Sequence, residues 1–190
     1  MTLSALGIFS AAGVSGAVAS DYELIETSIL GSSTPSITFS SLGTYSSTYK
    51  HFQVRMTART DRSGTVSDSI KMEFNGDTSA GNYALHVLQG NGSSVGSGGY
   101  ANNAIELQRA TTTSDAANSF GFIVVDVLDA YAAKNKTIRA LGGFLASSDR
   151  VICLTSGLWK NTASLTSMTF RPGGGSNLVS GTRISLYGVK

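Results

Sequence analysis

KHFQVRMTAR, residues 50–59, decides the fold class because apolar and polar side chains alternate along it. Phe52, Val54, Met56 and Ala58 are each separated by one polar or charged residue. Successive side chains of a β-strand point to opposite faces of the sheet, so this period of two predicts a strand with one buried and one solvated face. A register shift of one residue would expose all four apolar side chains, and the pairing of this strand is therefore strongly specified.

The same pattern recurs on both sides of this stretch. DSIKMEF, residues 68–74, repeats the alternation and is followed at once by the turn NGD at 75–77, so we expect two consecutive antiparallel strands. The apolar run FGFIVV, residues 120–125, predicts a central strand that is covered on both faces. Further strands are expected at 22–30, 36–42, 82–89, 103–110, 120–130, 136–146, 150–159, 164–170 and 181–189.

The connections between these strands are rich in residues that favour turns. Examples are GSSTPS (31–36), NGSSVGSGG (91–99) and RPGGGSN (171–177). No segment has an apolar stripe of helical period and useful length, and 190 residues fit one domain. Eleven short strands with regular turn signals predict an all-β fold, a single antiparallel β-sandwich of jelly-roll-like topology over residues 21–190.

Composition excludes several kinds of partner. Fourteen Lys and Arg against twelve Asp and Glu give a net charge of +2, and the basic residues are scattered, so nucleic acid is not an expected partner. No run of 18 apolar residues occurs, and membrane insertion is not expected. The one cysteine, Cys153, lies in the apolar run VICL, which predicts a buried thiol.

The first twenty residues, MTLSALGIFSAAGVSGAVAS, are apolar and uncharged. An export signal cut after Ala19 is one interpretation, but no Lys or Arg precedes Lys50, so the basic start of a signal peptide is missing. Burying each large side chain contributes about 1.5–3 kcal/mol, whereas ordering each backbone costs about 1–2 kcal/mol. A fixed shape therefore needs a partner, and a flexible tail is the remaining alternative. We predict an extended assembly arm over residues 1–20 whose contacts are made by Leu3, Leu6, Ile8, Phe9 and Val14.

Catalytic motifs are weak in this sequence. Residues 92–96 match G-x-S-x-G, but their glycine-rich flanks cannot begin the helix that a nucleophile elbow requires. His51 and His86 have no ligand spacing around them. We therefore expect no catalytic residue, no metal ligand and no cofactor site, and predict that the protein is not an enzyme.

Asp126 and Asp129 are the one acidic pair that could suggest glycoside hydrolysis. Asp126 and Asp129 stand three apart, which on a strand places them on opposite faces, so they cannot act as paired acids. A carboxylate at 126, inside an apolar run, needs a partner, and Arg139 is a candidate. A secreted carbohydrate-active enzyme is thus the least favoured class.

Several motifs carry a family resemblance. YKHFQVRMTAR, SGLWKNTASLTSMTF and the closing GTRISLYGVK resemble small structural proteins encoded by tailed bacteriophages, especially those of aquatic bacteria, and the similarity covers nearly all of residues 20–190. The resemblance implies an all-β virion component that assembles as an oligomer, with a trimer favoured. It places the protein on the virion surface after assembly in the host bacterial cytoplasm, and it supplies no enzymatic residues.

Two placements on the particle compete. A head decoration or cement protein would attach its arm to the major capsid protein, and a weakly charged surface rich in Ser and Thr favours this placement. A tail fibre or baseplate adhesin would attach to tail proteins and present loops 90–100 and 171–178 to host surface glycans. Aromatic side chains could stack on sugars if several share a face: Tyr45, Tyr49, Tyr83, Tyr100, Tyr131 and Trp159. The candidate recognition residues in the loops are Asn91, Ser94, Tyr100, Arg171 and Asn177.

Overall fold

The computed structural model describes residues 21–190 and confirms the all-β class. The candidate arm residues Leu3, Leu6, Ile8, Phe9 and Val14 lie outside the described residues. The strands are β1 (Tyr22–Ile29), β2 (Ile37–Phe39), β3 (His51–Thr60), β4 (Ser67–Phe74), β5 (Tyr83–Gly90), β6 (Val95–Asn102), β7 (Ile105–Thr112), β8 (Gly121–Leu128), β9 (Lys136–Leu145), β10 (Arg150–Trp159), β11 (Met168–Pro172) and β12 (Arg183–Val189). A short 3-10 helix, η1 (Leu42–Tyr45), precedes β3.

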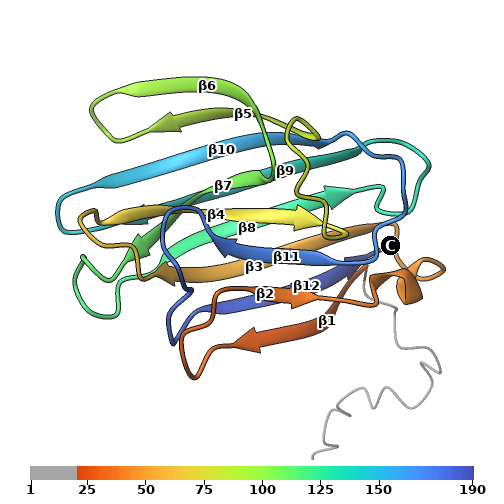
Figure 1. Cartoon of the computed structure of the whole chain (residues 1–190), viewed down its shortest axis with the longest axis horizontal. Coiled ribbons are helices and arrows are strands. Elements are labelled where there is room, and N and C mark those ends of the chain that lie inside the picture. Colours follow the sequence, from red (N-terminus) through yellow and green to blue (C-terminus); the bar gives the residue numbers. More distant parts are fainter. Residues whose placement is uncertain (1–20) are drawn as a thin grey trace, which may run out of the picture.

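Hydrogen bonds join these strands into a single open, mixed sheet (Figure 1). The order is β2-β11-β4-β7-β3-β8-β9-β10-β5-β6, with β12 added to β3 and β1 added to β12. Neighbours are antiparallel except β3 and β7, which pair in parallel through Arg59 with Thr111 and Thr60 with Thr112 only. The sheet is therefore mixed, where the sequence predicted antiparallel pairing alone.

Residues 50–59 form a strand with one buried face, as their alternation predicts. Phe52, Val54, Met56 and Ala58 of β3 are all buried. β3 lies between β12 and β8, whereas β4 lies between β11 and β7. The consecutive strands β3 and β4 thus pair with other strands and not with each other, because residues 61–66 carry the chain from one part of the sheet to another.

β6 lies in the glycine-rich stretch that was expected to be a loop. Its sequence VGSGGYAN has no alternating apolar residues, so a polarity pattern cannot mark it. The strand is held through its backbone, which pairs with β5 from Tyr83–Asn102 to Gly90–Val95. The turn between them is closed by Asn91, whose Oδ1 accepts the backbone N–H groups of Ser93 and Ser94. Twelve strands result, one more than predicted.

The apolar core is centred on the inner sides of these strands, and one aromatic group closes it at the β4–β5 end. The rings of Phe74, Tyr83 and Trp159 lie with centroids 5.3–6.4 Å apart. Trp159 donates its Nε1–H to Asp77 at 2.8 Å, so the turn after β4 is fixed to the core. Cys153 is buried, as predicted.

Candidate functional site

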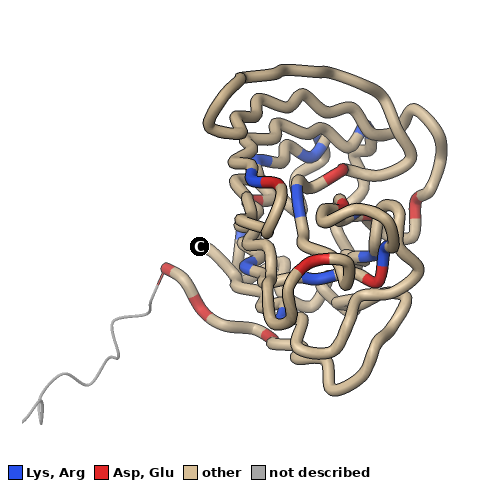
Figure 2. Tube along the Cα trace, turned by 90° about the vertical axis from the view of Figure 1, so that its left-hand side faces the viewer, with Lys and Arg blue, Asp and Glu red and all other residues tan. Residues whose placement is uncertain are grey.

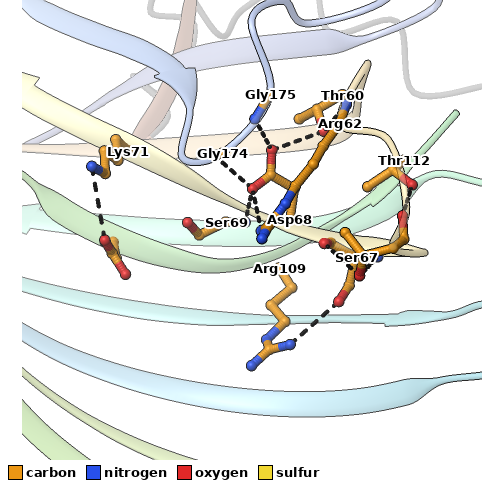
Figure 3. Close-up of polar contacts among 12 residues, drawn as sticks. Thr60, Arg62, Ser67, Asp68, Ser69, Lys71, Arg109, Thr112, Gly174 and Gly175 are labelled. Atoms are coloured by element: carbon orange, nitrogen blue, oxygen red, sulfur yellow. Dashed lines mark hydrogen bonds and ion pairs between the residues drawn. The ribbon is translucent and has the colours of Figure 1, made fainter. Parts of the chain in front are cut away.

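Two adjoining hollows beside β7 form a polar cleft. The larger, of about 400 Å³, lies along β4 and β7, and the smaller, of about 230 Å³, lies along β5 and β6. Tyr100, Gln108 and Arg109 line both hollows, so they are parts of one cleft. Figure 3 shows the side chains of β4 and β7 that surround its larger part.

Asp68, in the wall of this cleft, accepts hydrogen bonds from several segments of the chain. Its Oδ2 accepts hydrogen bonds from the Thr60 hydroxyl and the Gly175 N–H, each at 2.9 Å. Its Oδ1 accepts the N–H groups of Ser69 and Gly174 at 2.9 Å and faces Nη1 of Arg62 at 3.3 Å (Figure 3). The buried carboxylate thus accepts five hydrogen bonds, and those from Gly174 and Gly175 fix the 173–175 turn to β4.

The candidate recognition residues Arg171 and Asn177, which flank that turn, are engaged in internal contacts. Arg171 of β11 pairs with Glu73, with Nε to Oε1 at 2.7 Å. Asn177 donates its N–H to Asp61 at 2.8 Å and its side-chain amide at 2.7 Å. The N–H of Asn177 is the main cause that lowers the pKa of the Asp61 carboxyl below its usual value. The side chains of Arg171 and Asn177 therefore bind other residues of the same chain and hold this stretch in place.

Arg109, in contrast, has no acidic partner. Its Nε donates to Oε1 of Gln108 at 3.0 Å and its Nη1 to the Ser67 hydroxyl at 3.3 Å. Among residues 21–190, ion pairs within 4.0 Å take up the Arg62, Lys71, Arg139 and Arg171 charges but leave Arg109 unpaired. The other charged residues of the cleft lining, Arg62, Asp68 and Glu106, each have an ion-pair partner, so Arg109 is the one unpaired charge in this lining.

Tyr100, on β6, lines both hollows together with Arg109. The side chain is 43% exposed, and its ring lies over Gly98, where an added Cβ would be 3.5 Å from Cε1 of the ring. Burial raises the pKa of the Tyr100 phenol and Glu106 raises it further, against an opposing effect of Arg109. The phenol is therefore a protonated donor at neutral pH, next to an open ring face.

The structure brings only one of the predicted recognition residues to the cleft. Asn91 and Ser94 lie in the β5–β6 turn, at the opposite end of β6 from Tyr100. Asn91 there lines a separate polar hollow of about 280 Å³ with the turn between β9 and β10. Arg109 was missed because the sequence does not show which arginine lacks a carboxylate partner.

The six aromatic side chains that could have stacked on sugars do not share an exposed face. Tyr83 and Trp159 are buried in the core, and Tyr49 is buried with its hydroxyl donated to Glu23. Tyr131 is partly buried and donates to the Leu42 carbonyl. Tyr100 is the one member of the predicted set that is strongly exposed.

A second surface, here called the apolar face, lies on the outer side of β8, β9, β10 and β5. The register places Leu141 opposite Leu154 and Leu154 opposite Leu88 in one row across three strands. In the next row, Gly143 of β9 stands between Phe122 and Ile152. The five large side chains of the apolar face are between 44% and 69% exposed: Leu88, Phe122, Leu141, Ile152 and Leu154.

This face corrects one prediction from the sequence. FGFIVV was expected to be covered on both sides, but in β8 the side chains of Ile123 and Val125 are buried while Phe122 is half exposed. The strand is central in the sheet, between β3 and β9, and has one open face. Charges are scarce at the β5 and β10 side of this face: β5 and β6 contain no Lys, Arg, Asp or Glu and β10 only Arg150 (Figure 2). At the β8 and β9 side, the paired side chains of Asp126 and Arg139 lie in the row next to Leu141.

Asp126 and His51 have structural partners. Arg139 pairs with Asp126 at 2.7 Å, which confirms the predicted pairing. Nδ1 of His51 accepts the backbone N–H of Asp129 at 2.8 Å. In the described part of the chain, no three His, Cys, Asp or Glu residues are grouped so that they could hold a metal ion.

Comparison of the chain with protein families, with curated proteins and with solved structures finds no match. Within residues 21–190, no helix is long and apolar enough to cross a membrane. The polar cleft and the apolar face are thus the two features from which a function can be inferred.

Proposed function

We propose that the protein is a structural component of a tailed-bacteriophage virion and works by binding other subunits through the apolar face. Soluble monomers rarely expose contiguous apolar patches larger than a few hundred Å², and such patches mark sites of protein contact. Five large apolar side chains on four adjacent strands, with few charges around them, make a surface of this kind. This face is the observation that carries the proposal.

The placement that suits this face best is that of a head decoration protein. In that role, residues 1–20 attach to the major capsid protein and the apolar face packs against further copies of the chain, with a trimer favoured. Symmetry multiplies contacts that are individually weak. The resemblance of the LWKNTASLTSMTF and ISLYGVK segments to phage structural proteins supports the same role.

We also propose that the single sheet bends into two layers, as in a jelly-roll-like sandwich. β7 contacts β9 and β10 in addition to its hydrogen-bonded partners. A side chain at Gly121 or Gly142 would meet the carbonyl oxygens of Arg109 and Gln108, so β7 passes very close to β8 and β9. The two-pair link between β3 and β7 is the place at which such a bend would occur.

A tail fibre or baseplate adhesin is the second candidate function, because the polar cleft offers a site for a host glycan. The two roles differ in copy number. A decoration protein should match the capsid protein in purified particles, whereas a fibre should be present in a few trimers. Quantitative mass spectrometry of purified particles separates them.

Replacing Leu141 and Leu154 together by serine should leave the fold intact and weaken assembly at least about tenfold. Both side chains are half exposed, so their loss removes little internal packing. In an interface, each buried leucine contributes about 1.5–3 kcal/mol, and every 1.4 kcal/mol is about a factor of ten. The readouts are oligomer mass by light scattering and copy number per particle.

The matched control is serine at Leu24 and Ile29, which are 57% and 64% exposed on β1 and are separated from β8 by β12 and β3. This control should assemble normally. Deleting residues 2–20 from the otherwise unchanged chain measures the separate contribution of the arm. Normal incorporation of the Leu141 and Leu154 double variant would show that the apolar face is not the interface.

A further inference from the structure

We infer that the polar cleft binds an acidic saccharide, with the carboxylate of a uronic acid on Arg109 and a sugar ring against Tyr100. This inference deepens the second candidate function, since it names the class of glycan. It does not depend on the apolar face or on where the protein sits in a particle.

Arg109 supplies the anion site. A guanidinium has five N–H donors in a planar fork that matches a carboxylate, and Arg109 uses only its Nε and one Nη1 donor on its own chain. The neighbouring cations are already neutralised, Arg62 by Asp68 at 3.3 Å and Lys71 by Glu106 at 4.0 Å. A ligand carboxylate would therefore neutralise the one charge in the cleft that lacks a counter-ion.

Tyr100 supplies the sugar-binding surface. Tyr100 is 43% exposed, and its ring lies over Gly98 of the same strand, where the absence of a side chain leaves room for the ring. An aromatic ring with a polar tip suits a sugar, which has an apolar C–H face and a rim of hydroxyls. Gln108 and Ser67 present further polar groups to those hydroxyls.

The dimensions of the cleft fit a short oligosaccharide. Its larger part holds about 400 Å³, within the range of roughly 300–1,000 Å³ for small-molecule sites. Nucleic acid fits less well, because tracking a phosphate backbone needs several unpaired cations, and the cleft has one. One carboxylate on the bound sugar would match the single unpaired cation of the cleft, Arg109.

The test is a calorimetric titration of the full chain with trigalacturonate, trimannuronate and a hyaluronan tetrasaccharide, with maltotriose as the neutral probe. At least one acidic oligosaccharide should bind, more weakly as salt is added, and maltotriose should bind at least about tenfold more weakly. Arg109→Gln should weaken binding about ten- to hundredfold, and Arg109→Lys should restore only part of the loss. Tyr100→Ala should weaken binding several-fold. Arg183→Gln, the same change on the exposed outer side of β12, should have no effect.

Several outcomes would overturn the inference. These are failure of all three acidic oligosaccharides to bind, equal binding of maltotriose, or unchanged binding by a folded Arg109→Gln variant. Tighter binding of triglutamate would assign the cleft to an acidic peptide, and tighter binding of dextran sulfate would remove the carboxylate assignment. Because binding is measured on the isolated chain and assembly on particles, either proposal can fail while the other stands.

Discussion

Replacing Trp159 by alanine should lower the free energy of unfolding by about 3–5 kcal/mol, the usual cost of removing a buried aromatic side chain. Trp159 ends β10 and is fully buried, with the Phe74 ring centroid 5.3 Å away and that of Tyr83 at 6.4 Å. The substitution leaves a cavity and also removes a donor from Asp77. Thermal unfolding followed by circular dichroism should show a midpoint lowered by roughly 10 °C. A change of less than about 2 °C would mean that this aromatic group does not support the core.

Trp159→Phe removes the hydrogen bond to Asp77 but keeps an aromatic ring in the core. Its effect should appear in the pH dependence of the free energy of unfolding. The Trp159 N–H is the main cause that holds the pKa of the Asp77 carboxyl well below its usual range, and donors from Ser79 and Asn82 add to it. Because the pKa is depressed in the folded state, the carboxylate stabilises the protein above the unfolded pKa of about 3.9 and loses this effect as the pH falls below it. The phenylalanine variant should therefore lose less stability than wild type between about pH 5 and pH 2. Parallel acid profiles would show that the indole N–H contributes nothing.

The strands that could be predicted from sequence are those whose burial differs between their two faces. Residues 50–59 have this property, and their alternation gives β3 correctly because a polar residue on the buried side would be costly. β6 has no such difference, since none of its residues is buried on either face, and its backbone pairing with β5 defines it. In β8 the signal was misleading for the opposite reason. An apolar run has two physical explanations, burial on both sides or an exposed apolar interface, and polarity patterns do not separate them.

The candidate site was less predictable than the strands, because it depends on which charges find partners. The short-range pair of Asp126 and Arg139 could be proposed from sequence, since adjacent antiparallel strands bring them together. The pair of Glu73 and Arg171 joins residues 98 apart in the chain, and no local pattern marks it. That Arg109 lacks a carboxylate partner can be recognised only once the ion pairs of the other basic residues are known. Tyr100 was named from sequence as part of an exposed loop over residues 90–100, whereas in the structure it lies on β6.

Replacing Asp68 by asparagine should destabilise the protein by about 2–4 kcal/mol, although the two side chains have nearly the same shape. Each carboxylate oxygen accepts at least one backbone N–H, Ser69 and Gly174 on Oδ1 and Gly175 on Oδ2. Whichever way the amide is turned, its NH₂ group faces a backbone N–H that has lost its acceptor. A buried donor left unsatisfied costs about 1–3 kcal/mol, and loss of the charge also weakens the contact with Arg62. Chemical denaturation measures the change.

The amides that lose protection from hydrogen exchange distinguish the loss of these local hydrogen bonds from a general loss of stability. Asp68 holds the 173–175 turn at one end and Asp61 holds it at the other, through Ser176 and Asn177. Hydrogen exchange in Asp68→Asn should therefore rise first at the amides of this turn, while β3 and β8 stay protected until global unfolding. Asp21→Asn, which removes an exposed carboxylate, should change neither stability nor exchange. If the turn stays protected in Asp68→Asn, the five donors around this carboxylate must have other acceptors, and Asp68 would not be what fixes the wall of the cleft.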